Sequence, residues 1–292
     1  MASTPPVDAS ALPTEHQEEL KGFALNIRTC KLALQRSLDP LPESPLAYAD
    51  ALYPWEKVSA WSREYLLAAA DFLGFWADQF APLKFHPGTI NIIAYRPYLL
   101  LARSGLEAAA QGLWLIAADS PQDCIRRHVR LMHRDCQYHH DALKAGQIDA
   151  SDVQERMNKL AERAAEVDPS LRPRDKPPGF EKIIRNVAEK LSKDPDRWAY
   201  LWNAASGAAH GQNWFGVEAY ELLHKQEYEP GYFRVKRMPD PGYITATLDA
   251  AVTTLAGGTH LWLTYAGYTT DVWARALKDV FDQMPKLDDS NS

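Results

Sequence analysis

Apolar residues recur at helical spacing through most of this 292-residue chain, and runs of alternating β-branched residues are nearly absent. The segment 54–80, for example, carries tryptophan, leucine and phenylalanine residues three and four positions apart. This pattern predicts an all-α fold, a bundle of many helices. The predicted helices span about 15–38, 54–80, 91–118, 121–145, 151–167, 180–192, 195–210, 243–268 and 270–284.

Turn-forming residues mark several of the predicted boundaries. Ser120 followed by Pro121 is a typical start for the helix at 121–145, and Gly211 is a typical end for the helix at 195–210. The sequence at 85–88 is expected to form a loop. Near residues 228–238, a Pro-Gly pair lies between two short runs, and we expect one short β-hairpin whose best strand is 232–236.

The segment 168–179 contains four prolines and is the clearest internal loop or linker. Its flanking helices do not differ in composition, so we expect one helical domain at 15–284 that contains a proline-rich loop, in preference to two domains. Residues 1–14 resemble neither a signal peptide nor a transit peptide and are expected to form a disordered leader. Residues 285–292 are expected to form a disordered tail.

Composition narrows the class of protein. Hydrophobic residues make up 46% of the chain and charged residues 24%, which is typical of a soluble globular protein. The three cysteines are odd in number and include no CxxC pair, so a reducing, cytoplasmic location is expected. The most apolar stretch, at 90–118, is interrupted by charges and is expected to be a core helix instead of a membrane span. A formal charge of -6 excludes a generally basic surface.

A polar stripe runs along the predicted central helix. Arg103, Glu107 and Gln111 follow one another at steps of four, and Arg96 lies one heptad before Arg103. A buried charge without a partner costs several kcal/mol, so this stripe must face a polar partner or a wet cleft. Two interpretations are open: a structural Arg-Glu pair inside the bundle, or the lining of a pocket.

The predicted helix at 195–210 is a natural partner for that stripe. Tyr200, Asn203, Ser206 and His210 lie approximately on one of its faces, and the small residues around them would let another helix approach closely. The helix dipole favours a protonated His210 at the C-terminal end, and a nearby Glu107 would favour it further. His210 is accordingly either a core histidine with satisfied hydrogen bonds or a catalytic group.

Two short stretches are basic although the whole chain is acidic. The predicted helix at 121–145 presents Arg126, Arg130 and His133 on an outer arc, and a second basic stretch lies at 172–176. Solvation alone explains such a face in most proteins. The alternative is binding of phosphate groups or RNA, because arginine holds phosphate in a bidentate manner.

Motifs for metal or nucleotide chemistry are missing from the sequence. His133, Cys136 and His140 have a spacing that metal ligands can have, but no HExxH motif accompanies them, and we assign no metal site. The sequence has no Walker A loop, no GxGxxG motif and no GxSxG elbow. We therefore expect no cofactor.

Two short motifs resemble a group of uncharacterised bacterial helical proteins that is distantly associated with the HEPN superfamily, which includes abortive-infection proteins. The motifs are Ala-Arg103-Ser-Gly-Leu-Glu107 followed by Leu-Trp-Leu, and Tyr200-(x5)-Ser206-(x3)-His210-Gly211. The similarity covers about residues 91–211. It implies a helical fold, and Ala205 stands where the ribonucleases of that superfamily would have an arginine before His210.

HEPN ribonucleases carry an arginine, a polar residue, three further residues and a histidine, and Arg134-Asp135-Cys-Gln-Tyr-His139 fits that pattern. The resemblance implies RNA cleavage without metal, in which the histidine handles protons and the arginine steadies the phosphate, often across a homodimer cleft. On a continuous helix these two residues would be about 140° apart, so they would reach one phosphate only through long side chains or a partner subunit.

The sequence thus predicts a HEPN-like protein that binds RNA or another phosphate-bearing ligand, with a homodimer expected and a role in defence or as a toxin. Arg134 and His139 are the candidate nuclease pair. One alternative is a non-catalytic, dimerising regulatory or scaffold module. The other is a small-molecule enzyme with His210 as general base. The candidate ligand-binding residues are Arg103, Tyr200, Asn203, Ser206, Arg126, Arg130 and His133, and the further candidate catalytic residues are Glu107 and His210.

Overall fold

The computed structural model describes residues 14–83 and 95–284, and these residues form helices and one two-stranded antiparallel hairpin. The predicted fold class is confirmed. The helices are α1 (Thr14–Gln35), α2 (Pro45–Leu52), α3 (Val58–Phe80), α4 (Tyr95–Ile116), α5 (Pro121–Ala145), α6 (Ser151–Val167), α7 (Phe180–Lys190), α8 (Pro195–Ala209), α9 (Phe215–Glu218), α10 (Pro241–Tyr265) and α11 (Asp271–Gln283). The strands are β1 (Tyr220–Glu229) and β2 (Tyr232–Pro239).

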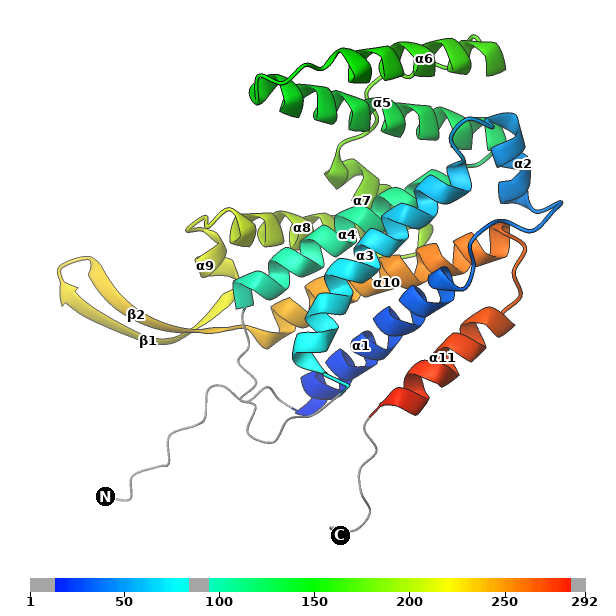
Figure 1. Cartoon of the computed structure of the whole chain (residues 1–292). Helices are drawn as coiled ribbons and strands as arrows, with labels where there is room; N and C mark the ends of the chain where they lie inside the picture. The colour runs from blue at the N-terminus through cyan, green and yellow to red at the C-terminus, as the bar shows by residue number, and fades with distance from the viewer. Residues whose placement is uncertain (1–13, 84–94, 285–292) are drawn as a thin grey trace.

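The centre of the bundle is formed by α3, α4 and α10, which pack on one another (Figure 1). Helix α1 packs on α3 and α10, and α11 lies against α1. On the other side of α4 lie α7 and α8. The apolar stripes predicted for these helices meet in one large core, where Leu66, Leu73, Leu106, Leu113 and Trp262 are fully buried.

Glycines allow α4 and α10 to approach α3 closely. A Cβ atom added at Gly112 of α4 would lie 3.0 Å from the carbonyl oxygen of Ser62 and 3.0 Å from Cγ of Leu66. A Cβ at Gly258 of α10 would lie 2.5 Å from Cδ2 of the same leucine. Leu66 therefore fills the space that two glycines leave open, which fixes how these three helices pack.

Helices α5 and α6 form an antiparallel pair over one end of the bundle (Figure 1). Helix α5 begins where it was predicted to begin, because the Ser120 hydroxyl accepts a hydrogen bond from the Asp123 amide at 3.1 Å and Pro121 occupies the first turn. A separate small apolar cluster of Cys136, Val153 and Met157 joins the outer part of α5 to α6. The predicted bounds of both helices are confirmed.

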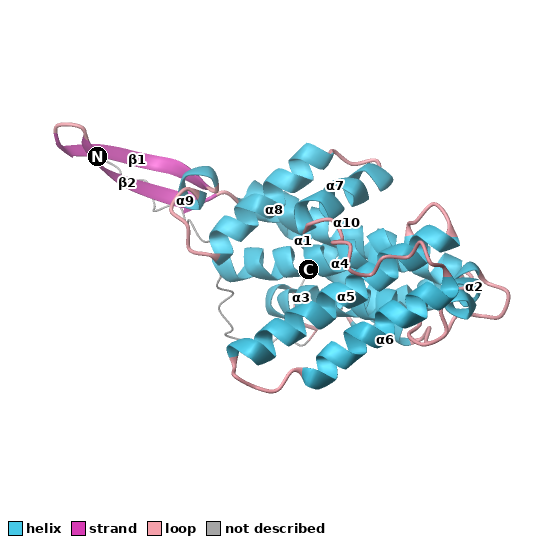
Figure 2. Cartoon of the chain, turned by 90° about the horizontal axis from the view of Figure 1, so that it is seen from above, coloured by secondary structure: helices cyan, strands magenta, loops and turns pink. Residues whose placement is uncertain are grey.

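The β-hairpin projects away from the helices (Figure 2). Its strands turn at Pro230-Gly231, where Gly231 adopts a φ of 78°, a conformation that glycine favours. A hairpin was predicted near 228–238. The structure extends it toward the N-terminus, so that its first strand begins at Tyr220.

The structure also corrects several predicted boundaries. Helix α2 was not predicted, and the first helix ends at Gln35 instead of near residue 38. Helix α3 begins at Val58, and α10 ends at Tyr265. The predicted leader up to residue 13, the loop at 85–88, the helix start at 91–94 and the tail at 285–292 lie outside the described residues. None of the helices in the described ranges combines the length and the apolar character needed to cross a bilayer.

Candidate functional site

The polar stripe of α4 contacts α8, as predicted. The contact is made by Trp202, which is not among the candidate site residues of the sequence analysis. The Nε atom of Arg103 lies 3.0 Å from Oε1 of Glu107 in an ion pair. The same carboxylate oxygen accepts a hydrogen bond from the indole N–H of Trp202 at 2.7 Å. The guanidinium of Arg103 lies 6.0 Å from the centroid of the Trp202 ring. Glu107 therefore has two partners in a largely buried position, which matches the structural interpretation of the stripe.

The third member of the stripe reaches the basic helix. Gln111 accepts a short hydrogen bond from the guanidinium of Arg134 on α5. That guanidinium also lies 5.4 Å from the ring centroid of Phe180 at the start of α7. The same guanidinium also forms a hydrogen bond with Tyr65 of α3. Burial raises the pKa of Tyr65 to about 12. Arg134 thus points inward, to a junction of α3, α4, α5 and α7.

The predicted polar face of α8 does not face α4. Tyr200 is partly exposed and its hydroxyl donates to Glu218 at 3.0 Å, while Asn203 is exposed and donates to the Ala199 carbonyl at 3.0 Å. The Ser206 hydroxyl donates to the Trp202 carbonyl of its own helix at 3.0 Å.

His210 is exposed at the C-terminal cap of α8. Among the described residues, the contacts of Glu107 are made by Arg103 and Trp202, and no contact with His210 is present. The expected cluster of Arg103, Glu107, Ser206 and His210 is therefore not assembled. The physical reason is that α8 buries its larger apolar stripe, which contains Trp198, Leu201 and several alanines, and turns its small polar side chains outward.

A different charged residue of α4 caps α8. The guanidinium of Arg96 donates to the Ala208 carbonyl at 3.4 Å and lies 5.5 Å from the ring centroid of Phe215. A cation at this place adds a hydrogen bond to a carbonyl of the last helical turn, which also accepts one from the Gly211 amide, and complements the helix dipole. Arg96 therefore has a structural role close to His210.

The candidate nuclease pair is separated by the helix that carries it. Both residues lie on the continuous helix α5, where a separation of five positions corresponds to about 140°. Arg134 points toward Gln111, whereas His139 is exposed. The two side chains of one chain therefore do not face the same phosphate.

The other histidines of α5 have different surroundings. His128 is fully buried, its Nε2 lies 2.8 Å from the Glu56 carbonyl oxygen, and burial lowers its pKa to about 4. Burial and then the neighbouring Arg174 lower the pKa of His133. His140 is buried and lies 3.3 Å from Asp141. Within the described part of the chain, no three histidine, cysteine or acidic residues come together as metal ligands.

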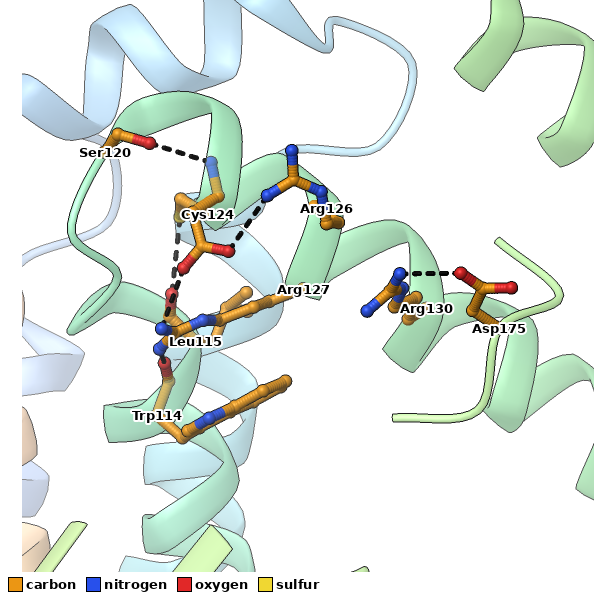
Figure 3. A network of polar contacts seen from close by, with 9 residues as sticks. Trp114, Leu115, Ser120, Cys124, Arg126, Arg127, Arg130 and Asp175 are labelled. Carbon is orange, nitrogen blue, oxygen red and sulfur yellow. Dashed lines mark hydrogen bonds and ion pairs between the residues drawn. The ribbon is translucent and has the colours of Figure 1, made fainter. Parts of the chain in front are cut away.

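The arginines at the start of α5 are held by a neighbouring carboxylate (Figure 3). Asp123 forms ion pairs with Arg126 at 3.2 Å and with Arg127 at 2.7 Å. Arg127 also donates to the Trp114 carbonyl at 2.6 Å, and its guanidinium lies 4.9 Å from the centroid of that tryptophan ring. Asp123 was not selected from the sequence, although its spacing of three and four residues from these arginines is the usual signal for such pairs.

The two basic stretches that the sequence showed separately meet in the structure. Arg130 of α5 forms a 2.7 Å ion pair with Asp175 in the segment 168–179 (Figure 3). Arg174 of the same segment is the second cause, after burial, of the lowered pKa of His133. The pKa of Asp168 is lowered first by hydrogen bonds from Ser170 and then by the charge of Arg126. We call this surface the basic patch. Its cations are Arg126, Arg130, Arg172, Arg174 and Lys176, and the last three are exposed.

A surface hollow lies at the start of α5. It is an open depression of about 270 Å³ between α2, the end of α4 and the start of α5. Its lining includes Leu46, Ile116, Cys124 and Tyr265. None of the predicted site residues lines it.

Comparison of the chain with protein-family models, with curated proteins and with solved structures finds no match. The assignment of function therefore depends on the geometry of these residues.

Proposed function

We propose that this protein binds the phosphate groups of RNA on the basic patch, where α5 meets the segment 168–179. The observation that carries the proposal is the 2.7 Å ion pair between Arg130 and Asp175, because two basic stretches from different parts of the chain meet there on one surface. Arginine binds phosphate through parallel hydrogen bonds, and the RNA backbone presents phosphates at regular intervals.

The charge balance of the patch supports this proposal. The patch has more cations than carboxylates, since its acidic neighbours are Asp123, Asp168 and Asp175. The whole chain carries a formal charge of -6, so the patch differs in sign from the rest of the molecule. A localised positive surface on an acidic protein directs a polyanion to one place instead of binding it everywhere.

A salt titration with single-stranded RNA tests the proposal. Fluorescence anisotropy of a labelled RNA of about 20 nucleotides should give an affinity that falls steeply as the KCl concentration rises. Replacing Arg172, Arg174 and Lys176 together by alanine should weaken binding at about 100 mM salt by at least about tenfold. It should also reduce the slope of log K against log salt by about 2, because each phosphate contact to a single strand contributes about 0.7.

The matched control removes the same number of positive charges elsewhere. Lys21 and Lys31 of α1 and Lys278 of α11 are on helices that pack on α3, α10 and each other, and their triple alanine variant should bind almost as the wild type does. Equal weakening by both triple variants would show diffuse attraction and contradict a specific patch. Salt-independent binding would contradict a phosphate contact.

Cleavage of the bound RNA is an extension of this proposal. Its support is the sequence spacing of Arg134 and His139, because the contacts of these residues do not bring them together. Arg134 is engaged by Gln111 and Phe180, so cleavage requires it to leave that position or requires a second copy to supply the other half of the pair. Incubation of the same RNA in excess EDTA tests this extension. If the His139→Ala variant cleaves RNA at the wild-type rate, His139 is not a catalytic residue. If cleavage is lost in the His210→Ala variant instead, the catalytic histidine lies at the end of α8.

A further inference from the structure

The β-hairpin is fixed at its base and free along its length. Near the base, the ring centroid of Tyr220 lies 5.2 Å from that of Tyr95, and the Tyr95 hydroxyl donates to the Ala219 carbonyl at 2.8 Å. Beyond this anchor, every side chain that the structure describes from Leu222 to Val235 is exposed. Figures 1 and 2 show the hairpin extending away from the helices in two views.

The exposed side chains include large apolar and aromatic ones. Leu222 is 54% exposed, Tyr228 52% and Tyr232 61%, and Phe233 and Val235 are exposed as well. A two-stranded hairpin that packs on nothing is marginally stable in water, and a third strand or a covering surface is what normally stabilises it. The hairpin thus has the character of a docking element.

The two outer edges of the hairpin differ in charge. In the described part of the chain the sheet consists of β1 and β2 only, so each strand has one outer edge. The sequence of β2 contains three basic residues and no acidic one, and two such edges from two copies would repel each other. The sequence of β1 contains three glutamates and one lysine, and Lys225 and Glu227 lie two positions apart in its middle.

Lys225 and Glu227 lie on the same face of the hairpin. They pair with Val235 and Phe233, respectively, which are themselves two positions apart on β2. The Lys225 ammonium lies 3.8 Å from the ring centroid of Phe233, and Oε1 of Glu227 accepts a hydrogen bond from the Gly231 amide at 2.8 Å. Both contacts lie within the hairpin, on β2 and at the turn, so an ion pair across the outer edge of β1 would replace them.

We propose that β1 pairs with β1 of a second copy of this chain, antiparallel and centred on Gln226. In this register the two-fold axis places Lys225 of each copy opposite Glu227 of the other, so these two positions are complementary, while the other two glutamates of β1 lie opposite uncharged residues. The register irregularities of β1 fall at Leu222/His224 and Glu227/Glu229, and the paired stretch from Lys225 to Glu227 lies between them. The product is a four-stranded sheet with strand order β2-β1-β1-β2.

Charge reversal tests this pairing. Sedimentation velocity from about 1 to about 300 µM should show a dimer of the wild type whose fraction rises with concentration. An interface made by one pair of strands is small for a specific interface, so the dimer is expected to be weak. Lys225→Glu and Glu227→Lys should each weaken dimerisation by at least about tenfold, because each places like charges opposite each other. A mixture of the two variants should dimerise again, because every opposed pair in the heterodimer is then of opposite sign.

The mixture also separates pairing from misfolding, because a variant whose hairpin does not form would not be rescued. The matched control is Arg234→Glu, which reverses one charge on β2 and should leave the dimer unchanged. Only monomer at about 300 µM, single variants that dimerise like the wild type, or no recovery in the mixture would each overturn the proposal. So would a dimer that Arg234→Glu dissociates, since that would place the contact on β2.

A crosslink tests the register itself. Antiparallel neighbours centred on residue 226 would have Cα atoms about 5 Å apart, which a disulfide can bridge. Gln226→Cys should therefore form a covalent dimer with oxidised glutathione as the oxidant, while the native Cys30, Cys124 and Cys136 are buried. Arg234→Cys should form little covalent dimer. Equal crosslinking at both positions would contradict the register.

Discussion

Acid should destabilise this protein through His128, a fully buried residue of α5. Its Nε2 lies 2.8 Å from the Glu56 carbonyl oxygen and therefore carries the hydrogen and donates a hydrogen bond to that oxygen. Nδ1 has no hydrogen-bond partner among the described residues. Tyr53 and Trp61 pack on the imidazole in T-shaped arrangements, each with its ring centroid 5.7 Å away. This apolar environment accepts the neutral imidazole and opposes the charged one.

The size of the effect follows from the two pKa values. Burial lowers the pKa of His128 from 6.5 to about 4 in the folded protein, whereas the unfolded chain keeps the higher value. Above pH 7 both states are neutral and stability is unaffected. As the pH falls below 6.5, the unfolded chain binds a proton that the folded protein excludes. The free energy of unfolding should therefore fall by about 2 kcal/mol by pH 5 and about 3 kcal/mol by pH 4.

A substitution that cannot titrate isolates this contribution. The glutamine side chain of His128→Gln can still donate a hydrogen bond to the Glu56 carbonyl. Burial also lowers the pKa of His133 and His260, but both histidines are present in the wild type and in the variant, so their contributions cancel in the difference. Urea unfolding followed by tryptophan fluorescence should show that the stability advantage of the wild type over the variant shrinks by about 2 kcal/mol between pH 7.5 and pH 5.

The exposed Asn203 provides a control that does not titrate, because Asn203→Ala should keep a constant difference from the wild type at every pH. If the difference between the wild type and His128→Gln is also constant within about 0.5 kcal/mol, the folded protein accommodates the imidazolium and the argument is wrong. A difference that grows in acid would mean that the charged form has a partner in the folded state.

Two further substitutions test the packing of the bundle by urea unfolding. Trp202→Phe keeps a large aromatic ring but removes the N–H that donates to Glu107 at 2.7 Å, so it should cost about 2 kcal/mol, and the cost should largely disappear when Glu107 is already alanine, which has no acceptor. A full cost in that background would show that the hydrogen bond is not the cause. Gly112→Ala should cost about 1–3 kcal/mol, because its Cβ would lie 3.0 Å from the Ser62 carbonyl oxygen. Gly74→Ala, with nothing within 4 Å, should instead stabilise by about 0.5–1 kcal/mol, and equal responses at the two glycines would refute the close approach.

The helices could be predicted where local chemistry determines them. Helix α5 was predicted to its exact ends because Ser120 and Pro121 form a local start signal, and a hydrogen bond within the first turn is all that this signal needs. Helix α2 was missed although Ser44 and Pro45 form the same kind of signal. The eight residues of α2 are too few to display an apolar period, and tertiary contacts to α3 and α5 support the helix instead.

The hairpin shows the limit of pattern-based prediction for strands. Alternation of apolar and polar residues appears when one face of a sheet is buried, and from Leu222 onward the described side chains of this hairpin are exposed on both faces. The Pro-Gly turn could therefore be predicted from its residue types, whereas the first part of β1 left no periodic signal.

The partner helix of the α4 stripe was predicted correctly, but its face was wrong. We selected Tyr200, Asn203, Ser206 and His210 because they are polar and share an arc, whereas burial follows the apolar side chains of the helix. Trp202 satisfies both demands, since its partly buried ring packs against the core and its N–H reaches Glu107. The contact between Arg130 and Asp175 could not be predicted at all, because it depends on how the segment 168–179 folds back on α5.

The strength of each ion pair indicates which of the predicted residues can bind a ligand. Arg130 and Asp175 keep 27% and 45% of their side-chain surface exposed, and such pairs typically contribute less than about 1 kcal/mol. Arg130 can therefore exchange the carboxylate for a phosphate with little loss of stability. Glu107 is 18% exposed and held by two partners, so moving it would leave a poorly solvated charge unpaired, which costs several kcal/mol. Ligand binding at the basic patch is thus compatible with a stable fold, whereas chemistry at Glu107 would have to disrupt it.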